Sequence, residues 1–186
     1  YLLGDWAFAV WDGRHRRLFL ARDQCGSASL YYYRDQRLFV FASSLKGLLA
    51  HPEVPRQLNT SALARMGPGA PGDAATLYEG ITKLTPGQSI TVSSEQVNIR
   101  SYWHVRDIPE IRFKTDQAYL DTFLDLYVEA VRCRLRSHRP IGTTLSGGLD
   151  SGSVATLAAR ELAQRGERLP AFSSIPLYDT SDTVPQ

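Results

Sequence analysis

The sequence predicts a mixed α/β protein built from two modules, an antiparallel α+β module followed by the start of a module with a parallel sheet. Three observations predict this division. Residues 1–103 contain short aromatic or β-branched runs separated by turn residues, which is the pattern of β-hairpins. A long series of apolar residues at helical spacing begins after residue 115. A strand, a glycine loop, a helix and a second strand then follow, an order that implies parallel pairing with a right-handed crossover.

Three β-hairpins and two short helices are expected in the first module. The hairpin strands are expected at residues 6–11 with 18–21, 30–33 with 38–42, and 89–92 with 97–103. Asp12 and Gly13 form the turn signal of the first hairpin. The short helices are expected at residues 45–49 and 61–66. Thr60 is expected to cap the second helix, and residues 67–73 are expected to form a loop inside the module.

The second module is expected to begin after a connection at residues 104–114. Thr115 is expected to cap a long helix, because apolar residues recur at helical spacing over residues 119–135. The elements expected after it are strands at residues 140–145 and 171–175 and a helix at 154–163. Gly166 is expected to stop that last helix.

Composition and charge argue against several classes of partner. The 186-residue chain has a formal net charge of +2, which is too small to draw it to nucleic acid or to an anionic membrane. No apolar run in the sequence approaches the length of a membrane span. The two cysteines, Cys25 and Cys133, give no disulfide framework and indicate a reducing, cytoplasmic setting. We expect both to be small buried hydrophobes, and we expect Trp6, Trp11 and Trp103 to lie in the core.

One stretch carries the strongest chemical signal. Between the predicted strand and the predicted helix stand Ser146, Gly147, Gly148, Leu149, Asp150 and Ser151. A helix N-terminus leaves backbone N–H groups without internal partners, and its dipole adds partial positive charge. The two glycines lack the Cβ atoms that would keep an anion away, and the two serines add hydroxyl donors. Since Asp150 offers an oxygen ligand suited to Mg²⁺, the stretch predicts a polyphosphate cradle.

A simpler interpretation treats the glycines as a turn and either Asp150 or Ser151 as a helix N-cap. The position between a strand and a helix favours ligand binding, because open α/β sheets bind ligands at the carboxyl ends of their strands. The loop lacks the Gly-Lys-Ser/Thr ending of a Walker-type phosphate loop and the spaced glycines of a dinucleotide-binding loop. Neither of those two sites is therefore expected.

The loop resembles the pyrophosphate-binding loop of the ATP pyrophosphatase superfamily, whose members release PPi after adenylating a carboxylate or a similar group. Further stretches, taken in order, resemble the glutamine-hydrolysing asparagine synthetase family. They lie at residues 4–12, 20–23, 30–32, 41–43, 80–87, 102–103 and 140–142. Their order, together with the loop, extends the resemblance over nearly the whole chain.

The resemblance implies two domains. Residues 1–110 would be the rear half of an N-terminal-nucleophile glutaminase, a class II glutamine amidotransferase with an αββα sandwich that releases ammonia from glutamine. Residues 111–186 would begin an α/β parallel-sheet ATP pyrophosphatase domain of the adenine nucleotide alpha hydrolase-like type. This domain would use ATP and Mg²⁺ to adenylate the β-carboxylate of aspartate or another carboxylate. With aspartate, ammonia would then give asparagine, AMP and PPi, and a homodimer is the candidate assembly.

The resemblance also assigns site residues. The loop would hold the phosphates of ATP, and Asp150 would coordinate Mg²⁺. Thr144 and Ser174 match family positions that contact the adenosine from adjacent strand ends. Arg22 and Asp23, which also match the family, are interpreted as a structural ion pair at the domain interface, in preference to a catalytic role. Because the resemblance places the glutaminase nucleophile before the first residue and the synthetase general base after the last, we expect an internal part of a longer protein that is inactive alone.

Three positions depart from the family pattern. Gly152 replaces a serine that is common after the loop, Ser44 stands where glutamate usually follows Ala-Ser, and Ser29 stands where proline often precedes Leu-Tyr-Tyr. These departures leave open a related adenylating cyclase of the lasso-peptide or β-lactam synthetase type, with a vestigial glutaminase domain. A non-catalytic nucleotide-binding or peptide-recognition module is a third alternative.

Overall fold

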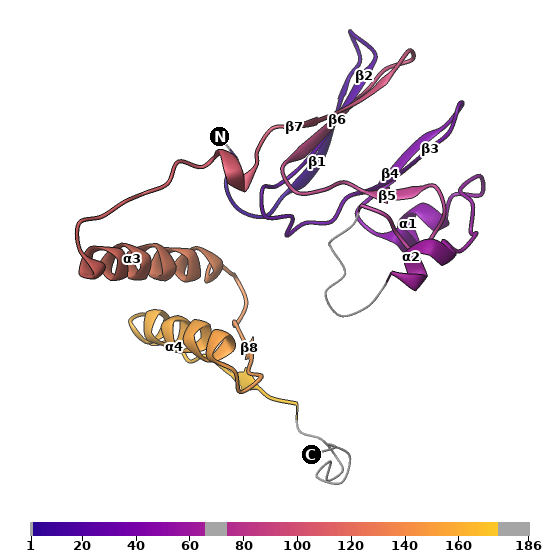
Figure 1. The fold of residues 1–186 in the computed structure, drawn as a ribbon. Coiled ribbons are helices and arrows are strands. Elements are labelled where there is room, and N and C mark those ends of the chain that lie inside the picture. The colour runs from indigo at the N-terminus through magenta and orange to yellow at the C-terminus, as the bar shows by residue number, and fades with distance from the viewer. Residues whose placement is uncertain (1, 66–73, 175–186) are drawn as a thin grey trace. The chain divides into compact units, whose positions relative to one another are not determined.

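The computed structural model describes residues 2–65 and 74–174, which belong to two compact units, Tyr1–Glu110 and Ile111–Gln186 (Figure 1). In the described residues, the first unit contains two antiparallel sheets, and the second contains two longer helices and a pair of short parallel strands. The loop expected at residues 67–73 and the last residue of the strand expected at residues 171–175 lie outside the described residues.

The first sheet has four antiparallel strands in the order β1-β2-β6-β7. They are β1 (Ala7–Asp12), β2 (Arg17–Arg22), β6 (Gln88–Val92) and β7 (Val97–Ser101). The predicted hairpins β1–β2 and β6–β7 are confirmed, and β2 pairs with β6 to join them. Leu20 stands opposite Ile90 in that pairing, and both side chains are fully buried. Because directly opposed residues of an antiparallel pair share a face, this face of the sheet forms a core.

The second sheet has three strands in the order β4-β3-β5. They are β3 (Tyr31–Arg34), β4 (Phe39–Ala42) and β5 (Ile81–Lys83). The predicted hairpin β3–β4 is confirmed. Sequence analysis does not predict β5, because three residues are too few to show an alternating pattern. Its pairing with β3 places Ile81 opposite Tyr33, and Ile81 is buried.

A hydrophobic core lies between the two sheets. Leu20 and Ile90 come from the first sheet and Tyr32 from the second. Leu30 and Leu84, which lie beside β3 and β5, complete the cluster. Each fully buried large apolar side chain stabilises such a core by about 1.5–3 kcal/mol relative to its exposed state.

Helix α1 (Leu45–Leu49) packs on the second sheet. Leu48 is fully buried in a cluster with Tyr33 and Ile81. Tyr33 and Tyr32 are neighbours in β3, so their side chains point to opposite faces of the sheet. The described layers of the first unit are therefore sheet, sheet and helix. A helical layer on the free face of the first sheet, which an αββα sandwich requires, stays a prediction.

Two polar residues cap the short helices. The Ser44 hydroxyl accepts a hydrogen bond from the N–H of Gly47 at 3.1 Å, which gives the departure from the family pattern at Ser44 a local structural role. Helix α2 (Thr60–Ala64) is capped by Asn59, whose side chain accepts from the N–H of Ala62 at 2.9 Å. The prediction of a Thr60 cap is wrong by one residue, because the amide side chain of Asn59 serves the same N–H groups. A short 3₁₀ helix, η1 (Val105–Asp107), follows β7.

Arg22 and Asp23 bind backbone groups instead of forming the expected ion pair. The Arg22 guanidinium donates to the carbonyl oxygens of Gly26, Ala28 and Leu84. The Asp23 carboxylate accepts from the N–H groups of Ser27 and Ala28, at 3.1 Å each. Burial disfavours its charged form, but these N–H donors hold the pKa of the Asp23 carboxyl below its usual value. The two side chains thus fix the chain between β2 and β3.

The second unit contains α3 (Asp116–Arg134), β8 (Thr143–Thr144), α4 (Leu149–Ala163) and β9 (Ala171–Phe172). The predicted cap of α3 is confirmed, since the Thr115 hydroxyl accepts from the N–H of Ala118 at 3.3 Å. The two helices pack through a buried cluster of Val131, Leu135, Ala158 and Leu162. Gly166 has a φ of +72° just beyond α4, as expected of a helix stop.

Three residues expected in the core lie at the surface. Cys25 and Cys133 are exposed, and Trp11 is 62% exposed. Trp11 lies on β1, an edge strand of the first sheet, so one side of it has no neighbouring strand. Cys133 lies on the solvent side of α3, where its thiol donates to a carboxylate oxygen of Glu129 at 3.2 Å. Residue type gives the frequency of burial, but the side of an element on which a residue falls decides each case.

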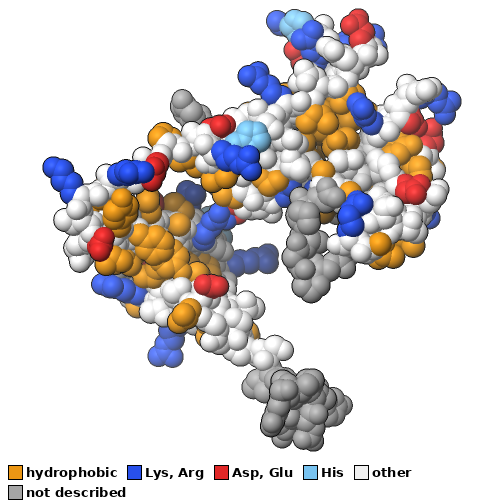
Figure 2. Space-filling model, viewed as in Figure 1, with side chains coloured by type: hydrophobic (Ala, Val, Ile, Leu, Met, Phe, Trp, Pro, Cys, Tyr) orange, Lys and Arg blue, Asp and Glu red, His pale blue; other side chains and the backbone are white. Residues whose placement is uncertain are grey.

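Hydrophobic side chains gather over α3 (Figure 2). The large exposed ones on this helix are Tyr119, Leu120, Phe123, Leu124 and Leu126. They lie outside the cluster that α3 shares with α4. Among the described residues, no helix combines the length and the apolar character needed to cross a membrane.

Candidate functional site

Residues 146–151 follow β8 at the carboxyl end of a parallel strand pair and run into the first turn of α4, which begins at Leu149. β8 and β9 run parallel, with Thr144 opposite Phe172. The N–H of Leu145 donates to the carbonyl oxygen of Phe172 at 2.8 Å, which extends the pairing up to the loop. The predicted order of strand, loop, helix and strand is therefore confirmed. The loop opens at the edge where parallel sheets bind ligands.

Two glycines set the backbone path of the loop. Gly147 has a φ of +83°, a conformation that favours glycine. A Cβ atom built on Gly147 would meet no other atom within 4 Å, so the space beside it is open. Gly148 is the N-cap of α4 and makes no side-chain cap hydrogen bond. The first N–H groups of α4 are therefore open to an external acceptor.

The alternative in which Asp150 or Ser151 caps α4 is wrong, because both lie inside the first turn of the helix. The hydroxyl oxygens of Ser146 and Ser151 lie 2.9 Å apart across the loop. The Ser151 hydroxyl oxygen also accepts from the N–H of Ser146 at 3.2 Å. The N–H of Gly148 donates to the hydroxyl of Ser146 at 3.4 Å. These bonds hold the two ends of the loop together and leave its middle facing outward.

The loop is exposed and fits a phosphate that arrives with a cation. Residues 146–150 are exposed. Among the described residues, no group of three or more His, Cys, Asp or Glu side chains is placed to hold a metal ion. Mg²⁺ commonly takes one or two carboxylates and completes its shell with waters and substrate phosphates. A single carboxylate, that of Asp150, beside open N–H groups therefore fits Mg²⁺ bound together with a polyphosphate.

Thr144 and Ser174 lie at the same edge of the parallel pair as the loop. Thr144 is the last residue of β8, and Ser174 follows the end of β9 by two residues. Both are exposed. The structure thus brings the loop and these two strand ends to one edge of the second unit, the edge at which open α/β sheets bind ligands.

Sequence analysis passes over two polar residues beside the loop. The hydroxyl of Tyr127, on α3, lies 2.7 Å from the hydroxyl of Ser153, on α4. The Ser153 hydroxyl also donates to the carbonyl oxygen of Asp150 at 3.0 Å. The tyrosine falls within the apolar spacing of α3 and the serine within a helix, so neither gives a local signal. A search for polar residues on the apolar face of α3 would have found Tyr127.

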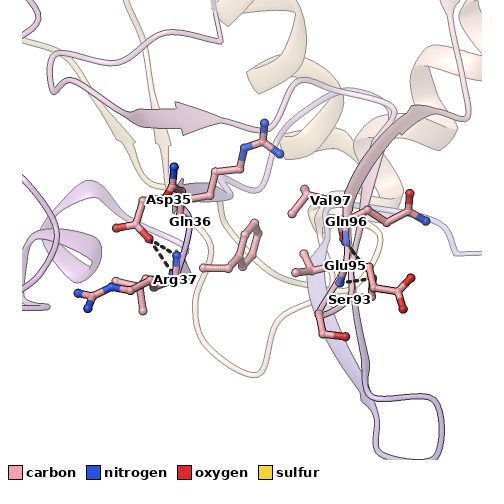
Figure 3. A pocket seen from close by; sticks show the side chains of 12 residues that line it. Asp35, Gln36, Arg37, Ser93, Glu95, Gln96 and Val97 are labelled. Carbon is pink, nitrogen blue, oxygen red and sulfur yellow. Dashed lines mark hydrogen bonds between the residues drawn. The ribbon is translucent and has the colours of Figure 1, made fainter.

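A cleft of about 540 Å³ lies in the first unit, between the β3–β4 turn and the β6–β7 turn (Figure 3). The Asp35 carboxylate accepts from the N–H groups of Arg37 and Leu38, at 2.7 and 2.8 Å. The Ser93 hydroxyl accepts from the N–H groups of Glu95 and Gln96, at 3.3 and 3.2 Å. These polar side chains stabilise the two turns, and their hydrogen-bonding capacity is used within them.

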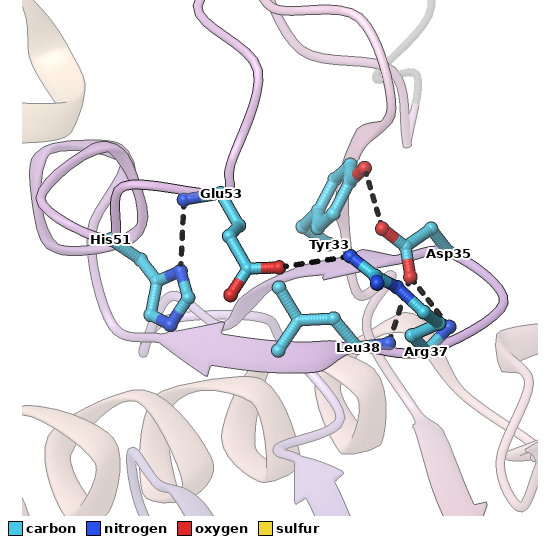
Figure 4. A network of polar contacts seen from close by, with 6 residues as sticks. All are labelled: Tyr33, Asp35, Arg37, Leu38, His51 and Glu53. Carbon is cyan, nitrogen blue, oxygen red and sulfur yellow. Dashed lines mark hydrogen bonds and ion pairs between the residues drawn. The ribbon is translucent and has the colours of Figure 1, made fainter.

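The same Asp35 belongs to a polar network that joins β3 to the chain after α1 (Figure 4). Its carboxylate accepts a hydrogen bond from the Tyr33 hydroxyl at 3.3 Å, and Arg37 lies 3.5 Å from the Glu53 carboxylate. The N–H groups of Arg37 and Leu38 hold the pKa of the Asp35 carboxyl below its usual value. Because the network is on the surface and each member has a partner in it, we assign it a structural role.

The two units match two known families. Residues 1–103 match the glutamine amidotransferase domain family, and residues 122–178 match the asparagine synthase family. The chain is 34% identical to asparagine synthetase [glutamine-hydrolyzing] 3 of Bacillus subtilis, a match that covers 90% of this chain and 27% of that protein. It is 33% identical to a putative asparagine synthetase [glutamine-hydrolyzing] 2 of Methanocaldococcus jannaschii, over 81% of this chain and 30% of that protein.

A third relative carries a different name. The chain is 32% identical to the amidase chry2 of Gibberella zeae, over 94% of this chain and 26% of that protein. The chain therefore spans less than a third of the length of each of these three relatives.

Proposed function

Because the chain belongs to the glutamine-hydrolysing asparagine synthetase family, we propose that the protein containing it is an ATP-dependent carbon–nitrogen ligase. Its substrates are ATP, glutamine and a carboxylate, for which aspartate is the first choice. An aspartate β-carboxylate oxygen attacks the α-phosphorus of ATP, and PPi leaves. Ammonia from glutamine attacks the carbonyl carbon of β-aspartyl-AMP, and AMP leaves with the electrons of the broken C–O bond. The attacking nitrogen loses a proton as the amide forms. With the hydrolysis of glutamine by water included, the products are asparagine, glutamate, AMP and PPi.

The observation that carries this proposal is the exposed loop between a parallel strand and α4. Gly147 adopts a φ of +83° and Gly148 leaves α4 without a side-chain cap. Backbone N–H groups at a helix N-terminus bind phosphate through hydrogen bonds and through the helix dipole. The loop therefore binds the phosphates that leave as PPi and lowers the energy of the negative charge that develops on them.

Five residues in and beside the loop have further roles in this scheme. The hydroxyls of Ser146 and Ser151 hold the loop in shape through their bonds to each other and to Gly148. When ATP binds, they turn from these acceptors and donate to the phosphates. Asp150 ligates the Mg²⁺ that accompanies ATP, and the cation offsets the repulsion between the carboxylate and the phosphates. Thr144 contacts the adenosine from the end of β8. Ser174 does so from beyond the end of β9, so the nucleotide lies along one edge of the strands.

Ammonia is proposed to come from glutamine, released at a glutaminase site whose nucleophile is not among the residues of this chain. Cys133 does not fit that role, because the hydrogen bond to Glu129 and the negative charge of that carboxylate raise the pKa of its thiol. A raised pKa lowers the thiolate fraction on which nucleophilic attack depends. Cys25 is exposed in the chain between β2 and β3. The first unit is the rear of that glutaminase domain in this proposal.

A different carboxylate is the second candidate. The relative from Gibberella zeae is named an amidase, which favours amide chemistry on a substrate other than aspartate. The adenylating step and the loop would be the same, while the acceptor would differ, as in enzymes that close a peptide or β-lactam ring. A panel of carboxylates in a PPi-release assay separates the two, because the true acceptor alone stimulates release.

The test uses the full-length protein with Asp150→Ala and, as a matched control, Asp125→Ala on the exposed side of α3. Loss of the Mg²⁺ ligand is expected to reduce carboxylate-dependent PPi release by about a hundredfold or more. The control variant and the wild type are expected to release PPi equally, and glutamine hydrolysis is expected to continue in both variants. Wild-type PPi release by Asp150→Ala would refute the role of that residue.

A non-catalytic module gives a different outcome in the same assays. Calorimetric titration would then show binding of ATP and Mg²⁺, while none of the carboxylates would produce AMP and PPi. Turnover of ATP to AMP and PPi with any carboxylate eliminates that alternative. Absence of both binding and turnover would overturn the assignment of the loop itself.

A further inference from the structure

The hydroxyl groups of Tyr127 and Ser153 form a directed hydrogen-bond chain to the loop. The Ser153 hydroxyl donates to the carbonyl oxygen of Asp150 at 3.0 Å. The Tyr127 hydroxyl lies 2.7 Å from the Ser153 oxygen. A serine hydroxyl has one proton, and Ser153 gives it to Asp150, so Tyr127 is the donor in the second bond. The chain therefore runs from α3 through Ser153 to the first turn of α4.

These two hydrogen bonds attach the first turn of α4 to α3. The loop beside this turn makes few contacts with other elements. The hydroxyls of Ser146 and Ser151 bond to each other and to loop backbone groups. Gly148 contributes no side-chain cap. The buried apolar contact between the helices involves Val131 and Ala158, each at least one turn beyond the tyrosine and the serine along its helix. The Tyr127–Ser153 bond thus ties the ligand-facing end of α4 to α3.

We propose that Tyr127 is a positioning residue for the nucleotide site, acting through Ser153 on the first turn of α4. The inference rests on the proposed function, since it assigns the loop a nucleotide. By fixing the carbonyl of Asp150, the bond fixes the direction of the neighbouring N–H groups and of the Asp150 side chain. A looser first turn would have to be ordered by the nucleotide on binding, which weakens affinity.

The hydroxyl can be separated from the ring of Tyr127. The ring packs against the buried cluster between the helices and lies 5.5 Å from the ring of Phe123, centroid to centroid. Tyr127→Phe keeps this packing and removes only the hydroxyl. Tyr119→Phe is the matched control, because Tyr119 lies on the same helix, α3, as Tyr127. Its hydroxyl also makes one hydrogen bond, accepting from the N–H of Phe113 at 3.0 Å.

The experiment compares Tyr127→Phe, Ser153→Ala, Ser153→Thr and Tyr119→Phe in the full-length protein. Loss of one such hydrogen bond is expected to raise the ATP KM in PPi release, and the calorimetric Kd for ATP with Mg²⁺, about two- to tenfold in Tyr127→Phe and Ser153→Ala. The value of kcat and the melting temperature are expected to stay at the wild-type level. Ser153→Thr keeps the hydroxyl and is expected to restore wild-type affinity, and Tyr119→Phe is expected to match the wild type.

Backbone hydrogen exchange in the absence of nucleotide measures how far the Tyr127–Ser153 bond orders the start of α4. Backbone amides in the first turns of α4 are expected to exchange faster in Tyr127→Phe than in Tyr119→Phe. Wild-type KM, Kd and exchange in Tyr127→Phe would overturn the inference, as would equal losses in both tyrosine variants. A wild-type protein that neither binds nor turns over ATP would instead overturn the proposed function, and the exchange comparison would still decide whether the bond orders α4.

Discussion

The hydroxyl oxygens of Ser146 and Ser151 lie 2.9 Å apart, although one residue precedes the two glycines and the other lies in the first turn of α4. This bond closes the loop into a ring. The ring holds the backbone of Gly147 in a left-handed conformation with open space beside it. The loop shape is thus set by contacts within the loop, before any ligand is bound.

Ser151→Ala is expected to weaken nucleotide binding more than Ser146→Ala. The Ser151 hydroxyl also accepts from the N–H of Ser146 at 3.2 Å and donates to the carbonyl of Gly148 at 3.3 Å. Each lost bond is expected to cost about 0.5–1.5 kcal/mol of binding free energy. Calorimetry of both single variants and the double variant measures their coupling. Strict additivity would show that the two hydroxyls do not act together.

Replacement by alanine is expected to change stability in opposite directions at Gly147 and Gly152. Gly147→Ala forces a side chain into a left-handed conformation, at a cost of about 1–2 kcal/mol, and is expected to lower both the melting temperature and ATP affinity. Gly152 lies within α4 and has no atom within 4 Å of its Cβ position. Gly152→Ala is therefore expected to stabilise the helix by about 0.5–1 kcal/mol. A lower melting temperature in Gly152→Ala would contradict this account.

Local signals account for what the sequence predicts of the fold. The hairpin β1–β2 consists of two apolar runs on either side of a turn. Helix α3 is capped by Thr115, and apolar residues follow at helical spacing. Each of these elements can therefore be predicted from one continuous stretch of sequence. The pairing of β2 with β6 joins strands far apart in the chain. It depends on the burial of Leu20 against Ile90, which no local pattern reveals. Strand β5 is missed because its three residues are too few to show an alternating pattern.

The candidate site divides in the same way. Residues 146–151 form a contiguous motif that runs from the end of a strand into a helix, so both the loop and its position at the strand end are predicted from the sequence. The bond between Tyr127 and Ser153 joins two helices. It depends on which side of α3 packs against α4, and the sequence of neither helix alone reveals that. A motif reveals the residues that meet a ligand more readily than those that hold them in place.

The stability of the first unit is expected to depend on pH through Asp23. Burial opposes its charge, yet N–H donors keep the pKa of the carboxyl below its usual value. A lowered folded-state pKa gives stability that is present above the unfolded pKa, about 3.9, and is lost as the pH falls through the folded pKa. Asp23→Asn is expected to lower the melting temperature at pH 7 and to reduce its decline between pH 5 and pH 3.

Asp125→Asn serves as the control for this pH dependence, because Asp125 is exposed on α3. It is expected to retain the melting temperature of the wild type at both ends of the range. If Asp23→Asn and the wild type lose stability in parallel as the pH falls, the hydrogen bonds from Ser27 and Ala28 do not favour the charged carboxylate and the pKa assignment is wrong.

Gly87 is expected to be the least replaceable glycine between the two sheets. Its φ is +68°, and a Cβ atom there would lie 2.6 Å from the carbonyl oxygen of Trp103. The obstacle is backbone, and the N–H of Gly87 is itself held by the carbonyl of Asp23 at 3.0 Å. Gly87→Ala therefore adds a steric clash to the conformational cost, and we expect a loss of more than about 2 kcal/mol in unfolding free energy.

Gly4→Ala measures the cost of a left-handed backbone conformation without the steric clash expected in Gly87→Ala. Gly4 has a φ of +91° and no atom within 4 Å of its Cβ position, so its replacement is expected to cost only about 1–2 kcal/mol. Thermal unfolding of the two variants in the full-length protein measures the difference. If Gly87→Ala is no less stable than Gly4→Ala, the chain around Trp103 must be able to move away. The contact that holds the end of β7 against the β5–β6 connection would then be weaker than the packing implies.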